Sequence, residues 1–132
     1  MFSIRPYRKG DCLGFKIRAD HETGTDTELD ESFQEYGGTS IISQDNRCIG
    51  AISYFISADY EVYVFCAFRN TPTRELILFV KEMLRIAATT SPLNFYCYGV
   101  DSEKEEKFLS WLGFEKTAIK EENAYKYKYT RG

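Results

Sequence analysis

FLSWLGFEK, residues 108–116, predicts a helix that ends at a glycine and continues directly into a strand. Ser102 precedes this helix, and Glu105 lies three residues further on, which is the spacing of a capping box. Gly113 suits the left-handed backbone position that closes a helix, and Phe114 can fold back onto the last turn. These signals predict a helix–glycine–strand corner in a protein of mixed α and β structure.

The helix of this corner has an apolar stripe. Phe108, Trp111 and Leu112 recur at spacings of three and four residues, so we expect them to share one face. A longer helix precedes it in the chain and continues to residue 88. Thr71 as its N-cap and Pro72 at its first helical position are a typical start signal.

Alternating apolar residues and turn signals divide the rest of the chain. Strands are predicted at residues 2–8, 39–43, 48–58, 61–68, 93–100, 114–120 and 124–130. Helices are predicted at residues 12–20, 29–36, 72–88 and 102–112, whereas the acidic, Thr- and Gly-rich residues 21–31 look least ordered. A helix joins the strands at 61–68 and 93–100, so these two should run parallel.

We therefore predict an α/β (α+β) fold, with one domain spanning residues 1–132. Its sheet is mixed and mostly antiparallel, with about six to seven strands and one central parallel pair. Helices are expected on both faces of this sheet.

Composition limits the classes of function. The net charge of −3 and the pI near 5.3 argue against a general nucleic-acid binder. Four scattered cysteines without a C-x-x-C pair indicate free thiols in a reducing, cytoplasmic compartment. His21 is the only histidine, so we expect no metal site, and no apolar run reaches the length of a membrane span.

The order of elements resembles the GCN5-related N-acetyltransferase (GNAT) superfamily across nearly the whole chain. Ile4-Arg5-Pro6 before an acidic turn is similar to the first strand of that family, and Phe108–Phe114 to its late F-Y-x-x-L-G-F corner. Within it, Arg18-Ala19-Asp20-His21-Glu22 and Asn94-Phe95-Tyr96 resemble the small GNAT-like proteins of T7-type phages. Those are described as internal virion or acetyltransferase proteins, which implies the host cytoplasm or the virion as location.

The resemblance implies acetyl-CoA as cofactor, bound between the parallel strands at 61–68 and 93–100. Its pyrophosphate would lie on an R/Q-x-x-G-x-G/A loop at the start of the following helix, where backbone N–H groups favour an anion. The matching candidates are Phe68, Arg69, Asn70, Thr71, Thr73 and Arg74. Pro72 and Arg74 replace the glycines, so two interpretations stay open. Either Arg69 and Arg74 grip the phosphates, or these are simply basic residues beside a helix start.

The resemblance also nominates catalytic residues. Leu109 stands where the family has a tyrosine that protonates the leaving thiolate, so Tyr96 or Tyr98 would have to substitute as acid. Glu61 or Asp59 would accept the proton of the amine. The alternative for the two acidic residues is an exposed turn without a catalytic role, and for the two tyrosines it is packing in the core.

Two functions follow. The first is an acetyl-CoA-dependent N-acetyltransferase with a degraded cofactor loop, acting on an amine acceptor. The second is a non-catalytic GNAT-fold phage protein that binds a host or virion protein. The fold alone does not decide between them.

Overall fold

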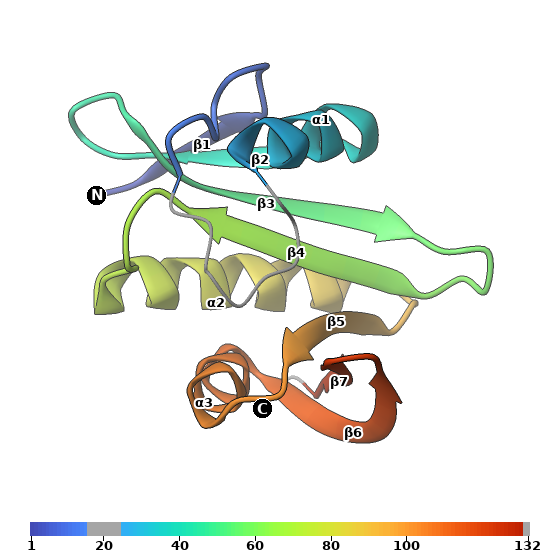
Figure 1. The fold of residues 1–132 in the computed structure, drawn as a ribbon. Helices are drawn as coiled ribbons and strands as arrows, with labels where there is room; N and C mark the ends of the chain where they lie inside the picture. Colours follow the sequence, from blue (N-terminus) through green and yellow to red (C-terminus); the bar gives the residue numbers. More distant parts are fainter. Residues whose placement is uncertain (16–24, 131–132) are drawn as a thin grey trace. The chain divides into compact units, whose positions relative to one another are not determined.

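The computed structural model describes residues 1–15 and 25–130, and that part contains seven strands and three helices (Figure 1). The strands are β1 (Ser3–Pro6), β2 (Thr39–Ile42), β3 (Cys48–Ile56), β4 (Val62–Phe68), β5 (Phe95–Val100), β6 (Phe114–Glu121) and β7 (Ala124–Tyr129). The helices are α1 (Asp26–Tyr36), α2 (Arg74–Thr90) and α3 (Glu103–Leu112).

The strands form one sheet in the order β1-β2-β3-β4-β5-β7-β6. β4 and β5 run parallel, with Val62 opposite Phe95 and Tyr63 opposite Tyr96, whereas β1–β2, β2–β3, β5–β7 and β6–β7 are antiparallel. The predicted mixed α/β fold with a central parallel pair is therefore confirmed.

The chain divides into two compact units. Unit 1 comprises Met1–Phe55 and Phe65–Thr73, and unit 2 comprises Ile56–Val64 and Arg74–Gly132. Both units therefore receive residues from β4. Each unit is described by itself below.

The core of unit 1 forms around Phe33 of α1, which is fully buried. Its ring stacks on Tyr7 at 4.8 Å between centroids and meets Phe65 of β4 at 4.9 Å. Gly38 is needed beside it, because a Cβ there would lie 2.9 Å from the Phe33 ring. The aromatic residues thus join α1 to the sheet within this unit.

In unit 2, α3 packs closely against β5. A Cβ on Gly99 would lie only 2.4 Å from Cδ1 of Leu109 and 3.0 Å from the ring of Tyr127. α3 also contacts α2 and β6. Glycine at residue 99 therefore permits the close approach of helix and strand.

The ends of α3 match the sequence prediction. The Ser102 side chain accepts a hydrogen bond of 3.1 Å from the backbone N–H of Glu105. Gly113 closes the helix with φ of 105° in the left-handed region, and its N–H donates to the Leu109 and Ser110 carbonyls. Phe114 then packs edge-on against Tyr129, with 5.4 Å between ring centroids.

The apolar stripe predicted for α3 coincides only in part with its buried face, because Leu112 is buried and Trp111 is not. Glu105, Leu109 and Leu112 are the buried residues of this helix, whereas the Trp111 side chain is 56% exposed. Residues 105, 109 and 112 keep the spacing of one helical face, and Trp111 lies about 100° from Leu112 around the helix.

Three predicted helix starts differ from the structure. Gly10 and Gly14 have φ of 92° and 87° in a series of turns, so no helix begins at Cys12; residues 16–20 lie outside the described part. α1 begins at Asp26, inside the stretch predicted to be least ordered, because Thr25 caps it. α2 begins at Arg74, so Thr71 does not cap it and Pro72 lies before the helix.

Candidate functional site

Strand register brings four polar side chains onto one face of the sheet in unit 2. Tyr63 of β4 lies opposite Tyr96 of β5, and Tyr98 lies opposite Lys126 of β7. Partners in a register share a face, and so do residues two apart along a strand. Glu61, two residues before Tyr63, joins them. We call Glu61, Tyr63, Tyr96, Tyr98 and Lys126 the tyrosine–lysine cluster.

The cluster is built around the carboxylate of Glu61. The Lys126 ammonium donates to both carboxylate oxygens, at 3.0 and 3.2 Å from Nζ, and the Tyr63 hydroxyl donates to Oε1 at 2.9 Å. The Tyr63 ring stacks on the Tyr98 ring at 5.8 Å with an interplanar angle of 3°. The same ring lies 5.9 Å from that of Tyr96. Of the three predicted catalytic residues, Glu61, Tyr96 and Tyr98, all therefore meet in one cluster.

The contacts of the cluster shift the pKa values of its members. Hydrogen bonds from Lys126 and Tyr63 hold the pKa of Glu61 below its ordinary value. The pKa of Lys126 is raised by its hydrogen bond with Tyr63 and, against the opposing effect of burial, by Glu61. The pKa of Tyr96 is raised by burial and then by the charge of Glu61.

These shifts define what the cluster can do at neutral pH. Glu61 is ionised and a weak base, since a general base works best with a pKa near the working pH. Burial, together with its neighbour Tyr63, raises the pKa of Tyr98. Tyr96 and Tyr98 therefore keep their protons and can donate them. The alternative base, Asp59, lies exposed in the turn before β4.

Lys126 is the member of the cluster that the sequence did not indicate. The alternation in β7 separates Tyr125, Tyr127 and Tyr129 from Lys126, but it does not show which strand receives the lysine. The β5–β7 register supplies that information by placing Lys126 opposite Tyr98.

The first two residues predicted to bind the cofactor pack within unit 1. Phe68 lies against Gly50, where a Cβ would be 3.1 Å from the Phe68 ring. The Arg69 guanidinium donates through Nε to the Cys48 carbonyl at 2.7 Å and lies 5.1 Å above the Phe15 ring. Two longer hydrogen bonds join it to the carbonyls of Leu13 and Asp11. Arg69 therefore links the turn at residues 11–13 to β3 by hydrogen bonds.

The other four predicted cofactor residues are exposed: Asn70, Thr71, Thr73 and Arg74. Arg74 is the first residue of α2, so it brings a positive charge to the helix end where the first N–H groups have no partner within the helix. Pro72 precedes the helix and therefore removes none of these donors. Glu75 in the first turn adds a negative charge, which competes with an anionic ligand. The free N–H groups at the start of α2 and the positive charge of Arg74 therefore suit a phosphate group.

Solved structures of N-acetyltransferases share this arrangement of helices and strands. A chimera of the spermidine N-acetyltransferase SpeG from Vibrio cholerae and hSSAT superposes with a TM-score of 0.71 at 11% identity, covering 98% of this chain and 95% of that one. An N-acetyltransferase from Staphylococcus aureus Mu50 gives 0.64 at 16% identity, with 99% and 98% covered. The GNAT domain of S. lividans PAT gives 0.62 at 13% identity, with 75% and 67% covered.

The chain has the GNAT fold.

At these identities the likeness concerns the fold alone. No protein-family model matches the chain, and no curated protein matches it significantly. The GNAT fold agrees with the first resemblance drawn from the sequence. The narrower likeness to phage proteins depends partly on residues 18–22, which lie outside the described part of the chain.

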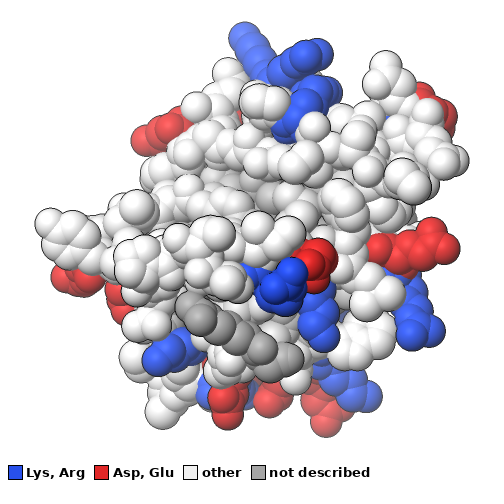
Figure 2. All heavy atoms as spheres, turned by 180° about the vertical axis from the view of Figure 1, so that it is seen from behind, with Lys and Arg blue, Asp and Glu red and all other residues white. Residues whose placement is uncertain are grey.

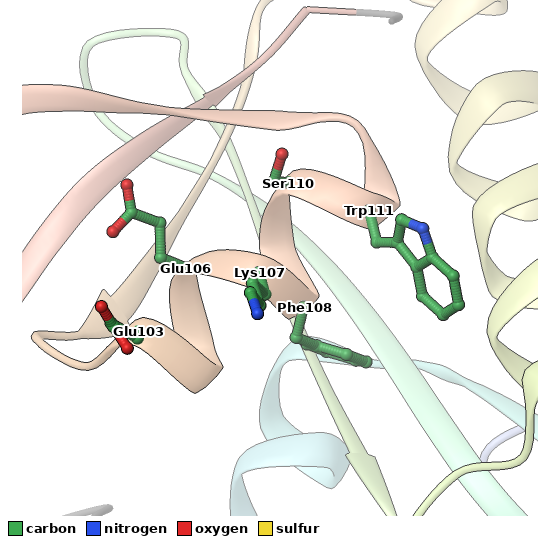
Figure 3. Close-up of a pocket in the computed structure, with 6 residues that line it drawn as sticks. All are labelled: Glu103, Glu106, Lys107, Phe108, Ser110 and Trp111. Atoms are coloured by element: carbon green, nitrogen blue, oxygen red, sulfur yellow. The ribbon is translucent and has the colours of Figure 1, made fainter.

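A surface hollow on α3 lies apart from the tyrosine–lysine cluster. It is lined by Glu103, Glu106, Lys107, Phe108, Ser110 and Trp111. Figure 3 shows these side chains fanning out around the helix, with Phe108 and Trp111 on one side and the glutamates on the other. Side chains that diverge in this way do not form a site for one reacting group. We therefore do not place the active site of the GNAT fold there.

Leu109, at the position where the resemblance to the GNAT superfamily implies a tyrosine, is buried against Gly99 and has a packing role. Tyr127 and Tyr129 of β7 are only 1% and 9% exposed, so these tyrosines do not form a surface on which nucleic-acid bases could stack. On the face drawn in Figure 2, basic and acidic side chains alternate along the lower edge.

The helices α1, α2 and α3 are each too short or too polar to cross a bilayer. In residues 1–15 and 25–130 there is no group of three His, Cys, Asp or Glu side chains that could hold a metal ion.

Proposed function

We propose that the chain is an acetyl-CoA-dependent N-acetyltransferase that transfers an acetyl group to an amine. The observation that carries the proposal is the tyrosine–lysine cluster, which lies on the parallel strand pair of a GNAT fold. The SpeG chimera and the S. aureus protein, which share this fold, are both described as N-acetyltransferases. We also infer that residues 1–132 act as one domain.

In this proposal, Arg74 and the first N–H groups of α2 hold the pyrophosphate of acetyl-CoA. Asn70, Thr71 and Thr73 precede this helix in the chain and stay further candidates for cofactor binding. Acetyl-CoA supplies the thioester carbonyl that the amine attacks. Arg69 braces the preceding loop through the Cys48 carbonyl, and Phe68 anchors it against Gly50. The interaction with phosphate is carried by one arginine and a helix N-terminus instead of a glycine-rich loop.

The proton steps are assigned to the cluster. Either Tyr96 or Tyr98, which are protonated at neutral pH, gives one proton to the leaving thiolate, and the tyrosinate that results takes up the proton that the attacking amine nitrogen releases. Glu61, held ionised by Lys126 and Tyr63, stabilises a positively charged group of the acceptor. Its lowered pKa favours this electrostatic role over that of a proton acceptor.

One observation favours a second candidate, the non-catalytic GNAT-fold phage protein that binds a host or virion protein. Arg69 bonds to backbone carbonyls, and no glycine lies between residues 69 and 74. A chain that no longer binds acetyl-CoA would retain the fold for such a partner, in the host cytoplasm or in the virion.

Calorimetry with acetyl-CoA separates the two candidates. We expect micromolar binding to the wild-type chain and about tenfold weaker binding to Arg74→Ala, the effect of losing one charge-assisted hydrogen bond of roughly 1.5 kcal/mol. Arg85→Ala is the matched control, because Arg85 is exposed on the same helix and pairs with Glu82 at 2.9 Å. No binding at millimolar acetyl-CoA would exclude the enzyme and leave the second candidate.

A further inference from the structure

The ammonium group of Lys126 is enclosed within the sheet face. Its side chain is 11% exposed, and Nζ lies 3.0 Å from Oε1 of Glu61. The same atom lies 4.3 Å from the centroid of the Tyr96 ring and 5.4 Å from that of Tyr63. A carboxylate and two aromatic rings thus surround one primary ammonium.

Burying an ammonium is costly, and these neighbours are the groups that offset the cost. The carboxylate supplies charge-assisted hydrogen bonds, and each ring face attracts a cation at this distance. A carboxylate beside aromatic rings is also the chemistry by which proteins recognise free alkylammonium ligands. The surroundings of Lys126 therefore suit a primary ammonium group, and Lys126 carries such a group at the end of a four-carbon side chain.

We propose that Glu61, Tyr63 and Tyr96 form a binding site for a primary alkylammonium ion, and that Lys126 is its intramolecular occupant. Tyr98, which stacks on Tyr63, is 41% exposed, and the Glu61 side chain is 25% exposed, so solvent reaches the edge of the site. An external amine can therefore reach the carboxylate when the Lys126 side chain is absent or turned aside.

This inference deepens the proposed function by naming the chemistry of the acceptor. A group held against Glu61 stays protonated, as the raised pKa of Lys126 indicates, so it is not the nucleophile. The site would instead hold a second amino group of the acceptor, which makes the acceptor a diamine or a longer polyamine. Lys126 competes with that group for the same carboxylate.

Lys126→Ala and 1-propylamine test the site without any acetyl-CoA. The variant lacks Cγ, Cδ, Cε and Nζ, which are the atoms that propylammonium replaces. At an amine concentration ten times the dissociation constant, we expect its thermal unfolding midpoint to rise by about 3 °C or more. Sodium chloride at equal ionic strength and 1-propanol, a neutral molecule of the same length, should give no such rise.

Two further variants serve as controls. Lys128→Ala removes an exposed lysine from the same strand and face, so its midpoint should not respond to the amine. Glu61→Gln combined with Lys126→Ala should lose the response. Lys126→Thr leaves the ammonium position empty and suits a strand, so it replaces Lys126→Ala if that variant does not fold.

An equal response in the control variants, or no response in the folded Lys126 variants, would overturn the inference. Because acetyl-CoA is absent, this result is separate from the calorimetric test of the enzyme. A chain that binds propylammonium but no acetyl-CoA would contradict the proposed function and keep the alkylammonium site.

Discussion

Gly99 of β5 lies directly under α3. The Cδ1 atom of Leu109 would lie 2.4 Å from a Cβ at this position, nearer than any real Cβ contact allows. Glu105 and Tyr127 are also near, at 3.1 and 3.0 Å. The absence of a side chain at Gly99 therefore allows α3 and β5 to lie this close together.

We expect Gly99→Ala to lower the free energy of unfolding by about 1–3 kcal/mol, because the added methyl overpacks a buried contact. Urea unfolding measures the change. Leu109→Val removes the Cδ1 atom, so Gly99→Ala should cost less in that background. Strictly additive effects of the two substitutions would show that the contact with Leu109 is not the cause.

The helix α3 shows which parts of an element the sequence predicts. Its ends depend on single residues, and the Ser102 cap and the Gly113 stop are both confirmed. Its buried face depends on what packs against it. Spacing alone places Trp111 in an apolar stripe with Leu112, and it does not indicate that Leu109 packs on Gly99, because the contacts of a helix are a tertiary property.

Substitutions on the two sides of α3 should differ in cost. Trp111→Ala should change the free energy of unfolding by no more than about 1 kcal/mol, because the side chain is 56% exposed. Leu112→Ala should cost about 2–5 kcal/mol, because Leu112 is 2% exposed. Guanidinium unfolding followed by circular dichroism gives both values. A larger cost for Trp111→Ala than for Leu112→Ala would show that Trp111, and not Leu112, packs in the core.

The same reasoning applies to the candidate site. The positions of Tyr96 and Tyr98 on β5 and of Glu61 next to β4 could be predicted, since these strands carry strong apolar alternation. Lys126 could not, because its neighbours depend on the register of β7, which is a tertiary property. Arg69 could not either, since its backbone acceptors Cys48 and Leu13 are remote in sequence.

On the scale of the whole molecule, β4 links the two units, because Val62–Val64 belong to unit 2 and Phe65–Phe68 to unit 1. Removing a charge from unit 1 therefore tests whether the stability of unit 2 depends on that of unit 1. Asp11 lies in unit 1, where its carboxylate accepts hydrogen bonds from Arg5, Ser40 and the backbone N–H of Arg8. Burial alone raises the pKa of Asp11, but these hydrogen bonds outweigh it and hold the pKa at about 2.

We expect Asp11→Asn to lower the free energy of unfolding by about 2 kcal/mol at pH 7. The pKa of Asp11 is lower in the folded chain, so its contribution is complete above its ordinary value of 3.8 and disappears as the pH falls through about 2. The difference between variant and wild type should therefore vanish in acid. A difference that is the same at pH 2 and pH 7 would exclude the charge as its source.

The reporter for this experiment is the fluorescence of Trp111, the single tryptophan, which belongs to unit 2. If residues 1–132 unfold as one domain, Asp11→Asn in unit 1 shifts the fluorescence transition as far as the circular dichroism transition. Separate transitions would show two independently unfolding units.

The paths of the two units along the chain also bear on inheritance. The chain leaves unit 1 after Phe55, returns at Phe65 and leaves again after Thr73, so neither unit is one continuous segment. A single recombination event within the gene cannot transfer one unit to another protein without dividing the other. Intact transfer of either unit would require crossovers at all three of these boundaries.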